Sequence, residues 1–327
     1  MNIWLTGEGG SLALALSVSL IGNKDMHVLK APEMWKKHVS LHHGEKEVDI
    51  MATSFEHRML NLLDPRPDVI VHFAAVVNTD KCEHRPQECV DVNVEGTRRV
   101  LEVCKKLKCK MLYISTTATY DVTVKRPYVE TSAQNPMTIY GITKYAGELL
   151  VRNQTQVPWV VIRPCFILGN APTDHSSQLV RVAMHSALKK LWSEKAGATP
   201  QVTLNPFAMK DYMPIGDFSA ALISVLTNWA KTEGQVFNVS NMCCRPMGVY
   251  FEYLKTVMAD MHSTEIDMAW LPKSDYMGDH IVDSSKLRKT TGWKPVGDIE
   301  KQICLLAGTA PHLVSKAKKY NLELFYE

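Results

Sequence analysis

A tyrosine and a lysine four residues apart, Tyr140 and Lys144, could share one proton-transfer task. Helix-forming residues continue to Leu150, so a helix would place the phenol and the ammonium on one face, one turn apart. A positive charge beside a phenol favours the phenolate, so we expect Lys144 to lower the pKa of Tyr140 from its ordinary value of about 10. A surface helix with a packed tyrosine and a solvated lysine has the same spacing, so other residues must decide between the two.

Hydroxyl side chains follow the strand that is predicted upstream of this helix. The apolar run 111–114 is typical of a buried parallel strand, and Ser115, Thr116 and Thr117 come directly after it. Open α/β sheets bind their ligands at the carboxyl ends of the strands. These hydroxyls are therefore placed to meet a ligand.

A glycine-rich turn follows the first predicted strand, residues 2–5, and leads into a helix at 12–21. Glycines at 7 and 10 allow a tight turn and a close backbone approach, and Ala13 stands at the third small position, which tolerates alanine. The amides at the start of such a helix can face a pyrophosphate. The pattern predicts a dinucleotide site, and a glycine-rich loop with no ligand is the alternative.

The end of the second predicted strand, residues 27–29, bears on the choice of cofactor. NAD-preferring sites carry an Asp or Glu about 20 residues beyond the first glycine. Lys30 follows the strand here, and a cation suits a 2′-phosphate, so we predict NADP rather than NAD. Residues 48–50 are expected to end a third strand, with Asp49 near the adenine.

The apolar run 68–75 predicts a strand that is covered on both faces. Its small residues Ala74 and Ala75 would let a cofactor lie against the backbone, and His72 is interpreted as a packed histidine rather than a base. Strands alternate with helices through this half of the chain. The alternation predicts an α/β protein with a doubly wound parallel sheet.

Composition restricts the functional classes. The chain has 327 residues, of which 46% are apolar and 22% charged, as in an ordinary soluble globular protein. A net charge of +3 is too small to predict a nucleic-acid partner, and no apolar run is long enough for a membrane span, so we expect a cytosolic protein. Eight cysteines without a Cys-x-x-Cys pair or zinc-finger spacing predict reduced thiols and no metal.

Taken in order and spacing, the glycine turn, Ala74 and Ala75, Asn93, Thr116 and the Tyr140–Lys144 pair resemble the extended short-chain dehydrogenase/reductase (NAD-dependent epimerase/dehydratase) family. The resemblance extends to the stretches 161–164, 210–217, 236–239 and 283–295. It implies a Rossmann-type NAD(P)-binding domain at 1–164 and a smaller substrate-binding lobe at 165–327, with a segment at about 201–240 returning to the sheet.

The resemblance also implies roles for individual residues. Tyr140 would be the acid or base at the substrate oxygen, Lys144 would tune it and hold the nicotinamide ribose, and Thr116, with Thr117 as the alternative, would bind the reacting carbonyl. The expected cofactor contacts are Gly7, Gly9, Gly10, Ser11, Leu12, Lys30, Asp49, Ile50, Phe73, Ala74, Ala75, Val77, Asn93, Ile114, Tyr140, Lys144, Arg163, Pro164, Cys165 and Phe166. The expected substrate contacts are Thr116, Thr117, Asn78, Gln178 and Lys210, although a solvated lysine is the alternative for Lys210.

Departures from the family narrow the chemistry. Thr117 and Ala118 stand where 4,6-dehydratases carry an acidic pair, and Ala118 stands where GDP-fucose synthases carry a cysteine. The chain is most similar to the dTDP-4-dehydrorhamnose reductase group, in motifs that include Asp80, Lys81 and Glu83. That likeness implies NAD(P)H-dependent reduction of a nucleotide-linked 4-keto-6-deoxy sugar.

Two other functions stay open on sequence. A sugar-nucleotide C4 epimerase with tightly held NAD needs the same three catalytic residues. A non-catalytic regulatory subunit of the methionine adenosyltransferase beta type has the same fold. The tail at 311–327 could dock on the body or pair with a second copy, so a homodimer is possible.

Overall fold

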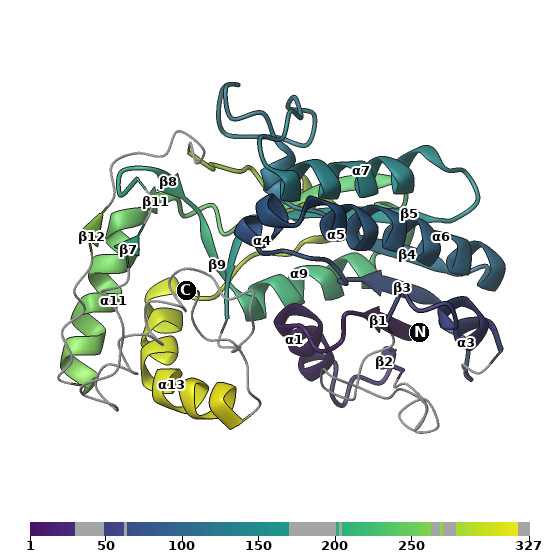
Figure 1. Cartoon of the computed structure of the whole chain (residues 1–327), viewed down its shortest axis with the longest axis horizontal. Coiled ribbons are helices and arrows are strands. Elements are labelled where there is room, and N and C mark those ends of the chain that lie inside the picture. Colours follow the sequence, from purple (N-terminus) through teal and green to yellow (C-terminus); the bar gives the residue numbers. More distant parts are fainter. Residues whose placement is uncertain are drawn as a thin grey trace.

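A six-stranded parallel sheet organises most of the chain (Figure 1). This computed structural model describes residues 1–29, 49–61, 64–169, 201–202, 205–262, 269–270 and 279–319. The strand order is β10-β5-β4-β3-β1-β2. In chain order the strands are β1 (Asn2–Thr6), β2 (His27–Val28), β3 (Val69–His72), β4 (Lys110–Ile114), β5 (Trp159–Pro164) and β10 (Gln235–Val239). The sheet extends in both directions from β1 and β3. This order confirms the predicted α/β fold with a doubly wound parallel sheet.

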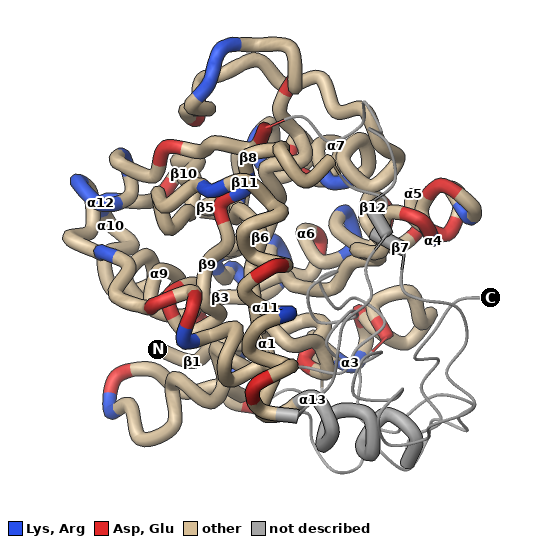
Figure 2. The backbone as a smooth tube through the Cα atoms, turned by 90° about the vertical axis from the view of Figure 1, so that its left-hand side faces the viewer, with Lys and Arg blue, Asp and Glu red and all other residues tan. Residues whose placement is uncertain are grey.

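Alternating side chains along the strands build a core on each face of the sheet. Ile3 and Leu5 pack toward α1 (Ser11–Ser19), α9 (Ile215–Thr227) and α12 (Ser285–Thr291). Trp4 packs on the opposite face, toward α3 (Phe55–Asn61), α6 (Gly96–Leu107) and α7 (Ile139–Asn153). Successive side chains of a strand point to opposite faces, so a strand buried on both sides is apolar at every position. Figure 2 shows helices on both sides of the sheet.

Short elements connect these layers. The segment between β3 and α6 contains α4 (Thr79–His84), α5 (Pro86–Val90) and a π-helical turn (Asp91–Glu95), and a 3₁₀ turn (Thr117–Thr119) follows β4. Outside the sheet, β6 (Phe166–Leu168) pairs with β9 (Tyr212–Pro214), and β8 (Met209–Lys210) pairs with β11 (Arg245–Pro246). The remaining elements are β7 (Gln201–Val202), β12 (Ala269–Trp270), α10 (Trp229–Thr232), α11 (Met247–His262) and α13 (Ile299–Lys319). In Figure 1, α11 and α13 lie side by side, away from the sheet.

Three expectations need correction. Asp49 and Ile50 lie in a turn and not in a strand, because the Asp49 carboxylate accepts the Met51 amide at 2.8 Å. The polar residues 78–81 predict a turn, and the structure instead begins α4 there. Asn78 caps that helix by accepting the Lys81 amide at 2.9 Å.

The third correction concerns the thiols. Cys82 and Cys89 form a disulfide, with their Cα atoms 5.6 Å apart, where reduced thiols were expected. Their separation of seven residues carries no disulfide signal on its own. The two short helices α4 and α5 bring the cysteines together.

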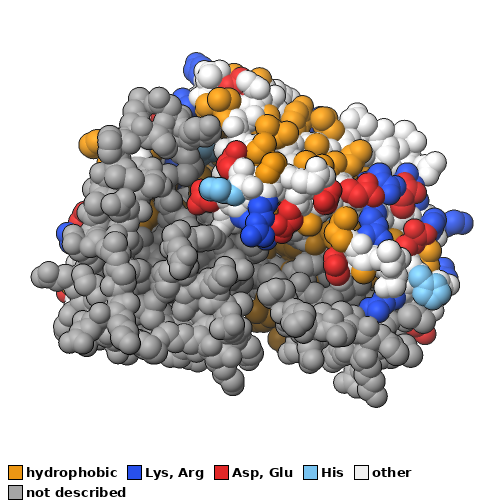
Figure 3. Space-filling view, in the orientation of Figure 1, with side chains coloured by type: hydrophobic (Ala, Val, Ile, Leu, Met, Phe, Trp, Pro, Cys, Tyr) orange, Lys and Arg blue, Asp and Glu red, His pale blue; other side chains and the backbone are white. Residues whose placement is uncertain are grey.

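Some predictions fall on residues that the structure does not describe. Lys30 and Gln178 are among them. Within the described part of the chain, no helix is long and apolar enough to cross a membrane, and no group of three or more His, Cys, Asp or Glu side chains could hold a metal ion. Where Figure 3 shows described residues, Lys and Arg side chains alternate with Asp and Glu rather than forming a patch of one sign.

Candidate active site

The glycine turn lies against the end of β3. Gly7 has a φ of +66°, and a Cβ added there would stand 2.9 Å from the backbone of Ala74. Only glycine fits such a left-handed residue in so close an approach. Gly9 and Gly10 complete the turn, and α1 begins at Ser11, so the amides of its first residues point out of the helix at the carboxyl edge of the sheet.

A buried histidine fixes this turn to α6. The Thr97 hydroxyl donates to the Asn93 carbonyl at 2.7 Å, so it must accept from His72 Nε2, which lies 3.1 Å away. His72 Nδ1 then accepts from the Thr6 hydroxyl at 2.7 Å, and Thr6 Oγ1 accepts the Ala74 amide. Burial lowers the pKa of His72 to about 3, with the nearby Lys144 charge a smaller cause. His72 is therefore a neutral packed residue, as its sequence context indicated.

Asn93 joins the loop after β3 to the start of α7. Its side-chain oxygen accepts the Val76 amide at 2.7 Å, and its side-chain nitrogen donates to the Val76 carbonyl and to the Thr143 hydroxyl, both at 3.0 Å. The Thr143 hydroxyl donates in turn to the Tyr140 carbonyl. The asparagine was expected to touch a cofactor, but both amide protons and its oxygen bond within the protein. In this structure Asn93 positions the turn that carries Tyr140.

Thr116 follows β4, and the turn after it packs against α7, whose first turn contains Tyr140. Burial of the phenol raises the pKa of Tyr140 to about 12, and the nearby Thr116 side chain opposes this shift with a smaller effect. The sequence-based expectation of a lowered tyrosine pKa is therefore wrong for this structure. The apolar contacts of the ring, with Val76, Cys82 and Cys89, disfavour the phenolate more than the Thr116 side chain favours it.

Lys144 is buried on the same helix. Its ammonium lies 4.3 Å from the centre of the Tyr113 ring, and it forms no hydrogen bond or ion pair within the described residues. Burial lowers the pKa of Lys144 to about 7, and the Glu148 charge opposes this shift. A buried cation that forms no hydrogen bond with the described residues can bind the hydroxyls of a ligand.

One turn further along α7, Glu148 joins the ends of β4 and β5. It accepts from the Ser115 hydroxyl at 2.8 Å and forms a two-point ion pair with Arg163, at 3.1 Å and 2.5 Å. Arg152 adds a contact at 3.0 Å. Hydrogen bonds from Arg163 and the other donors outweigh burial, so the pKa of Glu148 is lowered and its carboxylate stays charged. Ser115, directly before Thr116, is thereby fixed.

Other expected cofactor contacts fall into two groups. Phe73, Ala74, Ala75 and Val77 follow β3, and Pro164, Cys165 and Phe166 follow or end β5, all at the carboxyl edge. Ile50 and Ile114 instead pack their side chains into the core, and Arg163 is enclosed by its protein partners. These three side chains have structural partners, and the Ile50 carbonyl accepts a hydrogen bond from Arg99 at 2.6 Å.

The residues expected to contact the substrate also lie in different surroundings. Thr117 is buried beside Thr116, and Asn78 caps α4. Lys210 is fully buried, with its ammonium 5.2 Å from the centre of the Phe166 ring, so the alternative of a solvated charge is wrong. Burial lowers the pKa of Lys210 to about 7. Phe166 follows β5, so Lys210 lies next to a segment of the carboxyl edge.

Sequence reasoning missed Tyr113, Glu148 and the disulfide as parts of this site. The spacing of four between Lys144 and Glu148 was a usable signal for the carboxylate. Tyr113 lies in a strand and gave no signal, because its contact with Lys144 depends on how α7 packs over β4.

Comparison with known proteins places these features in a family. The family model described as "RmlD substrate binding domain" matches residues 1–202. A dTDP-4-dehydrorhamnose reductase of Sinorhizobium fredii is 28% identical over 183 residues, which is 56% of this chain and 56% of that protein. A UDP-glucose 4-epimerase of Lactobacillus helveticus is 25% identical over 249 residues, or 72% and 74% of the two chains.

Among solved structures, RMD from Pseudomonas aeruginosa complexed with NADPH superposes with a TM-score of 0.78. The superposition covers 95% of this chain and 99% of that one, at 20% sequence identity. This likeness shows the fold. The match to the curated reductase spans only a little more than half of that protein's length.

Proposed function

The chain belongs to the RmlD substrate binding domain family, within the extended short-chain dehydrogenase/reductases, and we propose that it is an NAD(P)H-dependent reductase of a nucleotide-activated 4-keto sugar. One observation carries the proposal. Thr116 and Tyr140 lie near each other at the carboxyl edge of a parallel sheet, and the Lys144 ammonium, one helical turn further on, has no anionic partner among the described residues.

The residues around the first turn fit a dinucleotide. Gly7 leaves a space that any Cβ would fill, and the first amides of α1 are available to a pyrophosphate. Lys144 would hold the ribose hydroxyls next to the nicotinamide. Bound NAD(P)H supplies the hydride for the reduction. NADP is proposed over NAD because Lys30 follows β2, and the structure does not describe Lys30.

Within this proposal, the protein handles the proton. Tyr140, whose pKa of about 12 keeps it protonated at neutral pH, donates to the substrate oxygen at C4 as that oxygen gains charge. Thr116 holds the same oxygen through its hydroxyl. An epimerase must first take a proton from a sugar hydroxyl, which a phenol with a raised pKa does poorly in its neutral form. The protonated phenol fits the proton donation that the reduction needs.

The substrate class is inferred from relatives. The reductase named above acts on dTDP-4-dehydrorhamnose by its name, so we propose a 4-keto-6-deoxy sugar linked to a nucleoside diphosphate. Lys210, buried beside Phe166, is the described cation proposed to face the sugar nucleotide. A homodimer and a cytosolic location stay predictions.

The test is a panel of 4-keto and 4-hydroxy sugar nucleotides offered with NADPH or NADH, with the products identified by mass spectrometry. We expect a mass gain of two hydrogens on a 4-keto substrate, with matching loss of NADPH absorbance. Interconversion of 4-hydroxy epimers without net cofactor consumption would identify the epimerase instead, the activity that the name of the Lactobacillus helveticus relative gives. Capture of a methionine adenosyltransferase with no turnover would identify the regulatory subunit.

A further inference from the structure

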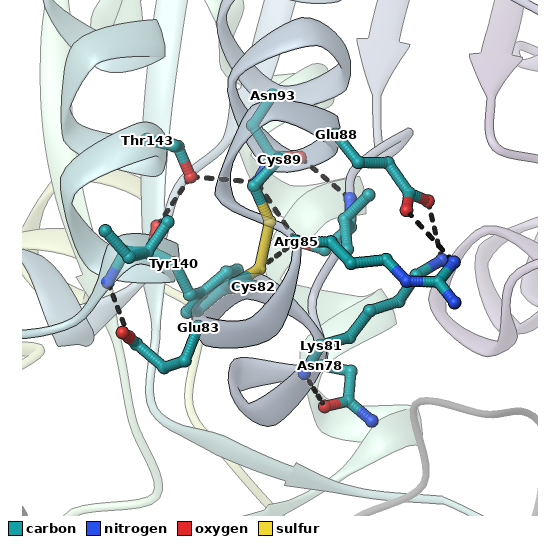
Figure 4. Close-up of a disulfide and its surroundings, with 12 residues drawn as sticks. Asn78, Lys81, Cys82, Glu83, Arg85, Glu88, Cys89, Asn93, Tyr140 and Thr143 are labelled. Atoms are coloured by element: carbon teal, nitrogen blue, oxygen red, sulfur yellow. Dashed lines mark hydrogen bonds and ion pairs between the residues drawn. A yellow bond between two sulfur atoms is a disulfide. The ribbon is translucent and has the colours of Figure 1, made fainter.

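The Cys82–Cys89 disulfide lies close to Tyr140, the tyrosine of the candidate site (Figure 4). Both cysteines are fully buried, and they form a small apolar cluster with Val76. The side chains of Val92, Ile139 and Tyr140 pack against this cluster. The packing of the Tyr140 ring therefore depends on where the two sulfur atoms lie.

The helices that carry the cysteines are also bonded to the start of α7. The Glu83 carboxylate, one residue after Cys82, accepts the Ile139 amide at 2.8 Å. This bond caps the first turn of α7, which contains Tyr140. A shift of α4 would act on the tyrosine by two routes, through the ring contacts and through this cap.

The covalent loop is open to solvent although its sulfur atoms are buried. All five residues from 83 to 87 are exposed, and α4 and α5 have only six and five residues. Besides the disulfide, the half-exposed ion pair between Lys81 and Glu88, at 2.6 Å, connects the two helices. Short, exposed segments open locally at low free-energy cost, and such an opening would bring the sulfur atoms to the surface.

We propose that Cys82–Cys89 is a reversible redox site, reduced by dithiols, that controls the alignment of Tyr140. A thiolate of the dithiol attacks one sulfur and forms a mixed disulfide, and its second thiolate then releases the second cysteine. The protein gains two electrons and two protons as two thiols, and the reductant leaves as its own disulfide. Where disulfides occur in a reducing compartment, they are usually catalytic or redox-sensing.

Reduction changes the packing behind the phenol. Two thiols cannot stay at bonding distance, so their sulfur atoms must separate within a cluster that Val76, Ile139 and Tyr140 already fill. In the oxidised form described here, Tyr140 lies near Thr116, because α7 packs against the turn that follows Thr116. We therefore assign the aligned, active state to the disulfide form and a misaligned state to the dithiol form.

The activity measurement rests on the proposed function. A second measurement, hydrogen exchange, does not depend on it. The full-length protein is equilibrated in buffers of reduced and oxidised dithiothreitol, and differential alkylation with peptide mass spectrometry gives the fraction of Cys82–Cys89 reduced. On the same samples, hydrogen exchange of residues 139–143 and kcat are measured. The hydrogen-exchange rate of that turn should rise at least about tenfold on reduction. The value of kcat should fall about tenfold, which is a part of the rate factor of about 10²–10⁴ that general acid catalysis contributes.

Matched variants test whether the redox response comes from Cys82 and Cys89. Cys82→Ser with Cys89→Ser should show fast exchange at 139–143 in every buffer, whereas Cys243→Ser, which removes an exposed free thiol, should keep the redox response. Complete reduction with unchanged exchange and unchanged kcat would overturn the proposal, as would a disulfide that never reduces in the folded protein or never forms. If no sugar nucleotide turns over in either redox state, the proposed function fails, and the exchange data still decide whether this site exists.

Discussion

Tyr140 and Lys144 have pKa shifts in opposite directions, and both come first from burial. The phenol is pushed toward its neutral form, to about 12, and the ammonium toward its neutral form, to about 7. A reductase needs the neutral phenol as proton donor and the charged ammonium as ligand for ribose hydroxyls. The tyrosine is therefore ready at neutral pH, and the protonation of Lys144 limits the pH range.

Replacing Tyr140 by Phe removes the proton donor and keeps the ring that packs on the disulfide cluster. Turnover should fall by about 10²–10⁴, the usual contribution of a general acid. Cofactor affinity, measured by quenching of protein fluorescence, should stay within about twofold because Lys144 and the glycine turn are unchanged. Full activity in the Tyr140→Phe variant would show that Tyr140 does not supply the proton.

The pH dependence of the reduction should report on Lys144. The sign follows from its lowered pKa: the lysine is charged below about pH 7 and loses its proton above it. We expect kcat/KM to be level below pH 7 and to fall about tenfold per pH unit above it, because kcat/KM follows groups of the free enzyme. Rates measured from pH 5.5 to 9.5 test this. A profile that stays level to pH 9 would contradict the assignment.

Residues close in sequence were the predictable part of the site. The Tyr140–Lys144 spacing and the glycines at 7 and 10 are local patterns, and the structure keeps both. The chain from Thr6 through His72 to Thr97 joins residues 66 and 25 positions apart, which no local pattern encodes. The two pKa directions also needed the structure, because burial depends on packing that is absent from the spacing.

At the scale of elements, α7 is held close to β4 by a glycine. A Cβ on Gly147 would overlap the Tyr113 hydroxyl and lie 3.0 Å from the Asn93 carbonyl. The Tyr113 hydroxyl donates to the Lys144 carbonyl at 3.1 Å, and its ring supports the Lys144 ammonium. Gly147 therefore sets the distance between Lys144 and the sheet.

Gly147→Ala should destabilise the protein although alanine is the better helix former. Overpacking of a filled core costs about 1–3 kcal/mol, against a propensity gain of about 1 kcal/mol. Gly216→Ala in α9 is the matched control, because no atom lies within 4 Å of its added Cβ and it should gain up to about 1 kcal/mol. Urea unfolding measures both. Equal stability of the two variants would show that α7 can move away from Tyr113.

Element positions were predicted better than element ends and joints. Apolar residues at helical spacing, up to Cys104, predict one helix from about residue 86, but the chain there contains α5, a π-helical turn and α6. The π-helical turn contains Asn93, whose side chain is bonded to Val76 and Thr143. Periodicity cannot predict such a turn, because it is favoured by contacts that a residue far along the chain provides.

Across the whole molecule, Arg163 connects the sheet to the C-terminal part of the chain. Besides Glu148, its guanidinium donates to the Tyr120 hydroxyl at 2.8 Å, and that hydroxyl donates to Asn238 at 2.6 Å. Asn238 lies in β10 and donates to the Asp283 carbonyl at 3.2 Å. The segment at Asp283 is thus fixed to the sheet through β10.

Glu148→Gln should therefore reduce global stability in a pH-dependent way. Removing one partner of a buried ion pair costs about 3–5 kcal/mol, and the Glu148 and Arg163 side chains are 0% and 1% exposed. The pKa of Glu148 is lowered in the folded state, so its contribution is complete above the unfolded pKa of about 4.5 and is lost as pH falls through the lower folded value. The wild type should exceed the variant in stability at pH 7, and the difference should shrink toward pH 3.

Chemical unfolding at both pH values measures this difference, and Glu95→Gln is the control. Glu95 pairs with Arg98 on the surface, with side chains 43% and 51% exposed, so its loss should cost less than about 1 kcal/mol. A variant at position 148 that unfolds like the Glu95→Gln control would mean that Arg163 finds other partners. In that case the connection between the sheet and the C-terminal segment would depend on Tyr120 and Asn238 rather than on the buried charge pair.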